Sequence, residues 1–381
     1  MNLKYGVLLI VLAVLAVICA LLFASVVGIK LIQTNRENKR KLAAKKINPP
    51  LRKLFSAETV DFFKNYEQHA SKLLGRLTDK YSLQTLENIL LEILEASDGE
   101  IKVRARMLAY YFKFPEKSLL MIRDRLTGNI AIGCRKAGFY QYEEAIPDIL
   151  KTLDIVSSNT QHQALMALAR IGNTDALLQA FDKIHRLILV NERAVSEIIN
   201  IFTGDRYKLY KEMIHHPSVY LVRLFLKAID REIANKLIEE IIAVYRTGDK
   251  ETRLACIIAI GRSGNSGKTY MLIHALDDPE WEIRAVAAKT LGVMIDPDAV
   301  EPLAKAARDG EWWVRQNAVT AILAYPNREA ILISIAQTGD RYSYDSMLYT
   351  LGKANKPELL TGVRKVWPEI PKSTIPINSS I

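Results

Sequence analysis

Residues 277–323 read DDPEWEIRAVAAKTLGVMIDPDAVEPLAKAARDGEWWVRQNAVTAIL, and within this stretch one short pattern occurs twice. Its arginines, Arg284 and Arg315, are 31 positions apart, and Arg253 lies another 31 positions upstream. Arginine recurs towards the N-terminus at a similar spacing, with a gap near residues 161–163. The earlier positions are Arg223, Arg193, Arg135 and Arg104. A fixed period of about 30 residues is typical of an array of stacked supersecondary units.

The residues that follow each of the last three arginines predict an α-helix. The third position is small and the seventh carries a branched apolar side chain, which is the spacing of one helix face. The small residues are Cys256, Ala287 and Ala318, and the branched ones are Ile260, Leu291 and Ile322. Small residues let helices approach closely, whereas branched ones fill the groove between them. Two short helices cannot bury their apolar faces alone, so we expect an all-α fold, an α-solenoid of stacked helical hairpins.

The pattern D-D-P-x-W-x-I-R-x-x-A-A-x-x-L-G, followed by D-P-D-A-V-E-P-L-A-K-A, resembles the HEAT repeat in its short bacterial, bilin-lyase-like form. The resemblance is good over residues 249–325 and fair over 130–180. It implies that the recurring arginines and aspartates serve neighbouring repeats through turn and inter-repeat hydrogen bonds, and not catalysis. The residues in this structural role are Arg253, Arg284, Arg315, Asp277, Asp278 and Asp309.

The N-terminal segment predicts a membrane anchor. Residues 6–29 are 24 consecutive residues without a charge, preceded by a short flank of residues 1–5. This length can cross a hydrocarbon core about 30 Å thick. The competing interpretation is a cleaved signal peptide, whose apolar region is usually about 7–15 residues long. We expect a retained transmembrane helix.

Positive charge follows the predicted span and favours a cytoplasmic C-terminal domain. Residues 1–53 hold ten Lys/Arg and one acid, so they carry +9 of the total +10. The near-neutral remainder argues against nucleic acid, which would require a basic solenoid face. Such a cluster beside a span attracts anionic headgroups, although a topology signal without lipid contact would look the same. The candidate membrane-surface residues are Arg36, Lys39, Arg40, Lys41, Lys45 and Lys46.

The remaining boundaries follow from proline. Pro49 and Pro50 remove backbone donors and disfavour helical backbone at the residue before them. We therefore expect a basic juxtamembrane linker over residues 30–53 and the solenoid over 54–365. Residues 366–381 contain three prolines and no helical period, which predicts a flexible tail or a strap over the last repeat.

The segment GRSGNSGKTY, residues 261–270, is spelled like the end of a nucleotide-binding P-loop. The P-loop requires glycine five positions before the glycine of Gly-Lys-Thr, and Arg262 occupies that position. It also requires a preceding strand, whereas residues 254–260 carry the helical pattern. We expect a turn between two helices of one repeat, with Lys268 exposed to solvent and dispensable.

No other motif predicts catalysis, a cofactor or a metal site. The pair His215-His216 precedes Pro217 and has no third ligand at a recognisable spacing, so a turn between helices is the better interpretation. The three cysteines are too scattered for a disulfide framework. We expect no enzymatic activity.

The predicted function is that of a single-pass membrane scaffold or adaptor that binds a protein partner at the cytoplasmic face. Solenoids bind partners through an extended concave surface, here assigned to the second helices of the hairpins. The candidate partner-binding residues are Trp313, Tyr342, Tyr344 and Tyr349. A tethered solenoid suits a partner that is itself membrane-bound, such as an enzyme or a transport assembly. The alternative is an enzyme, because the resemblance extends to bilin lyases and to HEAT-like DNA glycosylases that excise alkylated bases.

Overall fold

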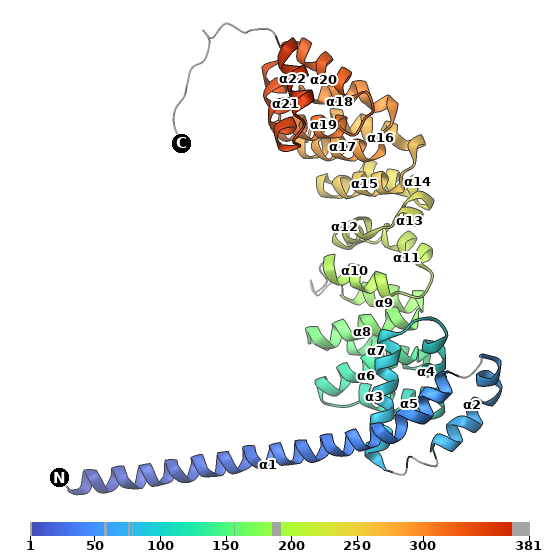
Figure 1. Cartoon of the computed structure of the whole chain (residues 1–381), viewed down its shortest axis with the longest axis vertical. Helices are drawn as coiled ribbons and strands as arrows, with labels where there is room; N and C mark the ends of the chain where they lie inside the picture. The colour runs from blue at the N-terminus through green and yellow to red at the C-terminus, as the bar shows by residue number, and fades with distance from the viewer. Residues whose placement is uncertain are drawn as a thin grey trace. The chain divides into compact units, whose positions relative to one another are not determined.

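The computed structural model describes residues 2–56, 59–74, 77, 79–155, 157–184 and 192–367. Within these ranges every regular element is helical, which confirms the all-α prediction (Figure 1). The chain divides into two compact units, Met1–Ile171 and Gly172–Ile381, which are described separately.

Unit 1 begins with a long helix and continues as paired shorter ones. Its helices are α1 (Asn2–Phe55), α2 (Thr59–Leu74), α3 (Lys80–Ala96), α4 (Gly99–Tyr111), α5 (Phe114–Ile122), α6 (Thr127–Tyr140), α7 (Ile146–Thr152) and α8 (Ser158–Ile171). A 3-10 turn, η1 (Glu143–Ala145), precedes α7. Helices α4, α6 and α8 contact one another in succession, and α5 contacts α7 in a second row. This is the two-row arrangement of a solenoid.

Unit 2 repeats the arrangement with greater regularity. Its helices are α9 (Thr174–Ile184), α10 (Glu192–Ile201), α11 (Arg206–Met213), α12 (Val219–Ala228), α13 (Arg231–Lys236), α14 (Ile238–Thr247), α15 (Lys250–Ser263), α16 (Thr269–His274), α17 (Trp281–Met294), α18 (Val300–Ala306), α19 (Trp312–Ile322), α20 (Arg328–Gln337), α21 (Arg341–Lys353) and α22 (Pro357–Val366). The 3-10 turns η3 (Ser266–Lys268), η4 (Ala275–Asp277) and η5 (Pro297–Ala299) lie between them. The first helices of the last four hairpins, α15, α17, α19 and α21, contact one another in succession. The second helices α18, α20 and α22 form the other row.

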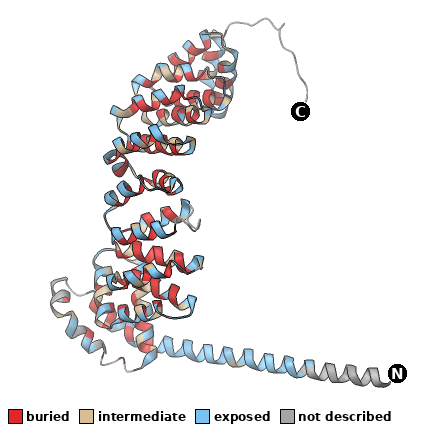
Figure 2. Cartoon of the chain, turned by 180° about the vertical axis from the view of Figure 1, so that it is seen from behind, coloured by how far each residue is buried: buried red, intermediate tan, exposed pale blue. Residues whose placement is uncertain are grey.

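The core of unit 2 follows the sequence pattern. The small and branched residues at the third and seventh positions after Arg253, Arg284 and Arg315 are all buried. Figure 2 shows buried residues alternating with exposed ones along the helices. Helices α17 and α19 approach closely, because a Cβ atom placed on Gly292 would lie 2.6 Å from the Cα atom of Ala321. Only glycine fits this close approach, so Gly292, in the last turn of α17, helps to set the spacing of two repeats.

The turn at residues 261–270 joins α15 to α16, as the sequence predicts. Gly264 ends α15 in the left-handed conformation, with φ +62°, and Asn265 accepts a hydrogen bond from the backbone N–H of Gly267 at 3.1 Å. The expectation for Lys268 was wrong: its side chain is half-buried and pairs with Glu239 at 2.5 Å. The cause is packing, because α14 of the preceding repeat lies beside this turn.

Helix α1 contradicts the predicted boundary between linker and solenoid. It continues through Pro49 and Pro50, and it buries Ala43 and Ile47 well before residue 54. Proline removes hydrogen bonds to the carbonyls four residues earlier, which belong to Lys45 and Lys46. Both lysines are exposed, so water can satisfy those carbonyls and the helix need not break.

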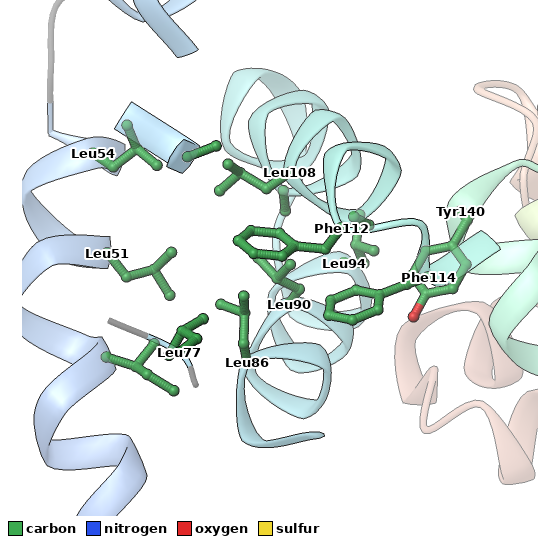
Figure 3. Close-up of a cluster of buried hydrophobic side chains, with 14 of the residues drawn as sticks. Leu51, Leu54, Leu77, Leu86, Leu90, Leu94, Leu108, Phe112, Phe114 and Tyr140 are labelled. Atoms are coloured by element: carbon green, nitrogen blue, oxygen red, sulfur yellow. The ribbon is translucent and has the colours of Figure 1, made fainter. Parts of the chain in front are cut away.

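The last turns of α1 belong to the core of unit 1. Leu51 and Leu54 lie against leucines of α3 and α4 in one buried cluster, shown in Figure 3. Phe112 and Phe114 close this cluster on the side of α5, with their rings stacked at a centroid distance of 5.8 Å. The segment predicted as a linker therefore supplies part of the hydrophobic core.

Candidate functional site

The recurring arginines and aspartates link neighbouring repeats. Arg284 donates from Nε and Nη2 to the carboxylate of Asp309, at 2.7 and 2.9 Å, and from Nη1 to the carbonyl of Asp278 at 2.9 Å. One repeat earlier, Arg253 donates to the Asp278 carboxylate at 2.5 Å. Both aspartates also accept a backbone N–H from the residue two positions later. These side chains therefore have the structural role that the repeat pattern predicts.

We call this series of arginine–aspartate pairs the arginine ladder. The Arg284–Asp309 pair shows its electrostatics. Burial on its own raises the pKa of Asp309, but the Arg284 guanidinium and a backbone N–H outweigh it, so the pKa of Asp309 is lowered. The hydrogen bonds that Arg284 donates to Asp309 also raise the pKa of Arg284. Both groups therefore stay charged at neutral pH, which is unlike the pKa matching that general acid–base catalysis requires.

Two members of the predicted structural set depart from the pattern. Asp277 pairs with Lys305 at 2.8 Å on the surface and contacts no recurring arginine. Arg315 donates to the carbonyls of Asp309 and Gly310, both at 2.8 Å, and to Ser346 at 3.1 Å. Ser346 stands 31 positions after Arg315, where another arginine would continue the series, so the ladder ends here.

Four side chains on α19 and α21 form an exposed cluster, which we name the aromatic surface: Trp312, Trp313, Tyr342 and Tyr349. The Trp312 ring meets the Trp313 ring edge to face at 4.8 Å and the Tyr349 ring at 5.4 Å. The guanidinium of Arg315 lies 5.3 Å from the Tyr342 ring centroid. Trp313 is 55% exposed, Tyr342 67% and Tyr349 49%, so three large rings face solvent on two adjacent helices.

The structure brings together three of the four predicted partner-binding residues and separates the fourth. Tyr344 stacks on Trp367 at 4.0 Å, with 18° between the rings, and is half-buried. Trp312 is an addition that the sequence did not predict, and it contacts both Trp313 and Tyr349. Residues 368–381 of the predicted tail lie outside the described residues.

The position of the aromatic surface also differs from the expectation. All its residues lie on α19 and α21, which are first helices of their hairpins, whereas the sequence analysis assigned partner binding to the second helices. The hydrophobic faces of the second helices α20 and α22 are buried against neighbours at Leu332 and Val363. The exposed aromatic side chains of these repeats gather on the first-helix row.

The candidate membrane-surface residues lie along α1. Arg36, Lys39, Arg40, Lys41, Lys45 and Lys46 are all exposed. Upstream of them, α1 is long and apolar enough to cross a membrane, and none of its most apolar window is buried in the protein. Lys39 approaches the ring of Tyr81 on α3 at 5.1 Å, so part of this basic segment touches unit 1.

The remaining polar groups offer no reactive centre in the part of the chain that the structure describes. The Nε2 atom of His216 lies 2.9 Å from Asp182, and its Nδ1 accepts the N–H of Ser218. No group of three potential metal ligands occurs among the described residues. Burial raises the pKa of Cys134 to about 11 and that of Cys256 to about 12, which makes both poor nucleophiles.

A cavity of about 730 Å³ opens beside the ladder, between α16, α18 and the link before α21. Three of the four acidic residues that line it are already engaged within the protein. Asp277 pairs with Lys305, and Asp309 pairs with Arg284. Asp340 accepts the N–H of Ser343 at the start of α21. The cavity walls therefore serve the repeat structure.

Comparison with known proteins gives one family match and several similar structures. The family model for HEAT repeats matches residues 269–333. An engineered protein solved by a structural genomics consortium covers 78% of this chain and 97% of its own, at 14% identity and a TM-score of 0.34. Human deoxyhypusine hydroxylase in complex with glycerol covers 77% and 96%, at 19% identity and a TM-score of 0.28. No curated protein matches the sequence. The family match falls on the hairpins from α16 to α20, where the arginine ladder is most regular, so residues 269–333 are similar to HEAT repeats.

Proposed function

We propose that the protein is a membrane-anchored scaffold or adaptor that binds a protein partner at the cytoplasmic face through its aromatic surface. The observation that carries this proposal is the aromatic surface itself, where Trp313, Tyr342 and Tyr349 are exposed on two adjacent helices. Tryptophan and tyrosine are among the residues that most often dominate the energy of protein interfaces. A rigid two-helix platform also presents them with little loss of conformational entropy.

The membrane anchor is supported by the apolar half of α1. From Val17 to Ile29 the side chains are apolar or small and none is buried, which in water would expose a large hydrophobic patch. A bilayer removes that surface from water. Nine lysines and arginines follow the segment up to residue 53, whereas only Lys4 precedes it, which favours a cytoplasmic solenoid. Anionic headgroups are the proposed lipid contact of the basic residues.

The tether favours a membrane-bound partner. Restricting both molecules to one membrane raises their effective concentration, so a weak surface contact suffices for a stable complex. An enzyme or a transport assembly in the same membrane fits this description. The arginines and aspartates of the ladder form ion pairs with one another, as Arg253 does with Asp278 and Arg284 with Asp309. Because these charged groups already have partners within the protein, they favour a binding role over catalysis.

Affinity purification from solubilised membranes tests the proposal. We expect a reproducible membrane protein to co-purify with the full chain and to be lost when Trp313 and Tyr349 are both replaced by alanine. Tyr270 provides the control, because it is 52% exposed but lies on α16, away from the first-helix row; Tyr270→Ala should retain the partner. Bilin transfer or excision of alkylated bases by the purified protein would instead establish the enzyme alternative. A reporter fused after Ile381 that is active only outside the cytoplasm would overturn the orientation.

A further inference from the structure

The basic segment of α1 is helical without interruption. Helix α1 extends from Asn2 to Phe55, and the sequence has no proline or glycine between Ile29 and Asn48. Residues such as lysine, arginine, leucine and alanine dominate here, and all favour helix. A helix bends sharply only at proline, glycine or an inserted group. The apolar segment and the solenoid are therefore joined by one straight element and not by a flexible linker.

The C-terminal end of α1 is fixed to the rest of unit 1 by burial and by a cap. Ala43 and Ile47 are buried against α3, one turn apart. At the C-terminus of α1, Arg104 of α4 donates from Nη1 to the carbonyls of Phe55 at 3.0 Å and Leu54 at 3.4 Å. A cation at a helix C-terminus satisfies carbonyls that have no partner within the helix and complements the helix dipole. The joint therefore holds the direction of α1.

The rise per residue of an α-helix gives the height of each residue of α1 above the edge of the hydrocarbon core. At 1.5 Å per residue counted from Ile29, Lys30 lies about 1.5 Å and Arg36 about 10 Å beyond that edge. Lys39 lies about 15 Å and Lys46 about 25 Å beyond it, and a tilt of about 20° changes these heights little. The headgroup layer is only about 5–7 Å thick on each side. Screening limits longer reach to about 8–10 Å at physiological ionic strength.

The basic residues farther along α1 lie where the helix approaches the solenoid. Lys39 lies 5.1 Å from the Tyr81 ring centroid, near the start of α3. The exposed side chains of Lys45 and Lys46 flank the buried Ile47, where α1 enters the core. This end of the basic segment is therefore part of the joint, and Lys45 and Lys46 lie too far from the hydrocarbon edge to contact headgroups.

We infer that α1 is a rigid stalk on which anionic headgroups contact Lys30 and Arg36, while the basic residues from Lys39 to Lys46 belong to the joint with the solenoid. The inference rests on the proposed membrane anchor and narrows its lipid contact to the first two turns beyond the span. Ala43, the first buried residue, then stands about 21 Å from the hydrocarbon edge. A partner of unit 1 must extend to that height, as a membrane protein with a cytoplasmic domain does.

Matched charge variants of the full chain in vesicles test this division. The vesicles contain phosphatidylcholine with phosphatidylglycerol, and energy transfer from a dye at Thr34→Cys, in a Cys19→Ala background, to headgroup-labelled phosphatidylglycerol reports its enrichment. Replacing Lys30 and Arg36 by glutamine should lower the enrichment, by up to about fivefold per removed charge. Replacing Lys45 and Lys46 by glutamine removes the same charge and should leave it unchanged. An equal loss of phosphatidylglycerol enrichment in the two double variants would overturn the inference.

A second measurement separates the stalk from the anchor itself. Quenching by headgroup-attached nitroxide should fall severalfold when the dye moves from Thr34→Cys to Leu42→Cys. Equal quenching at both positions would mean that the segment lies on the membrane, which overturns the stalk but leaves the anchored scaffold intact. Extraction of the chain from the vesicles by carbonate would instead overturn the anchor and, with it, the stalk.

Discussion

Arg284 and Asp309 are joined by two parallel hydrogen bonds, of 2.7 and 2.9 Å, across 25 positions of sequence. Both side chains are mostly buried, so the pair links the α17 hairpin to the start of α19. Asp309→Asn should cost about 1–3 kcal/mol, because a buried charged donor loses its charged acceptor. Hydrogen exchange of residues 281–322 in the full chain measures this as faster opening.

The same pair predicts a pH dependence. The pKa of Asp309 is lower in the folded protein than its ordinary value of about 3.9. Between the two pKa values the unfolded chain binds more protons, so the contribution to stability is complete above about pH 4 and is lost as the pH falls through the folded value. The difference in melting temperature between the native chain and Asp309→Asn should therefore shrink below pH 4. A difference that is constant from pH 7 to pH 3 would contradict the ion pair.

The close approach at Gly292 predicts that a larger side chain there would push two repeats apart and lower the stability of the protein. In Gly292→Ala the new Cβ would meet the backbone of Ala321 at 2.6 Å, and the shift this forces should cost about 1–3 kcal/mol. Gly352→Ala is the control, because nothing lies within 4 Å of its Cβ position; it should be neutral or stabilising by up to about 1 kcal/mol. Thermal denaturation of the full chain compares the two. Equal stability of the variants would argue against the close approach of α17 and α19.

Arg104 and Arg135 occupy the same position in successive repeats but differ in burial. Arg104→Met keeps the aliphatic volume and removes the cap on Phe55, which should cost about 1.5–3 kcal/mol and speed hydrogen exchange over residues 43–55. Arg135 pairs with Glu95 on the surface at 2.8 Å, so Arg135→Met should cost no more than about 1 kcal/mol. If both variants exchange equally over residues 43–55, the cap does not hold α1.

The three native cysteines test the environment of α1 without mutation. Cys134 and Cys256 are buried, whereas Cys19 is exposed on the apolar part of the helix. In intact membranes we expect a membrane-impermeant maleimide to label none of them, because the bilayer excludes the reagent from Cys19. Denaturation in SDS should release all three. Rapid labelling at a single cysteine in intact membranes would place Cys19 in water and contradict the span.

The repeat architecture was predictable because it depends on local periodicity. The 31-residue spacing of Arg253, Arg284 and Arg315 fixed the phase of the helices, and Asp278 and Asp309, the partners of Arg253 and Arg284, lie at a constant offset of 25 positions, at the start of the next repeat. Such contacts recur from repeat to repeat, so they can be predicted once the register of the repeats is known.

The errors concern contacts that do not repeat. Pro49 and Pro50 predicted a break, yet burial of Ala43 and Leu54 on either side outweighs the local cost of proline. Lys268 was expected in solvent because its partner Glu239 belongs to another helix and carries no motif. The aromatic surface was found only in part, since the contact of Trp312 with Tyr349 depends on how α19 meets α21.

Site-specific photo-crosslinking in cells tests the central claim most directly. A photoreactive phenylalanine replaces Trp313 on the aromatic surface or, in a parallel strain, the equally exposed Tyr270 on α16. We expect position 313 to crosslink reproducibly to one membrane protein and position 270 not to do so. No crosslink from position 313 above that from position 270 would contradict a scaffold that binds through this surface.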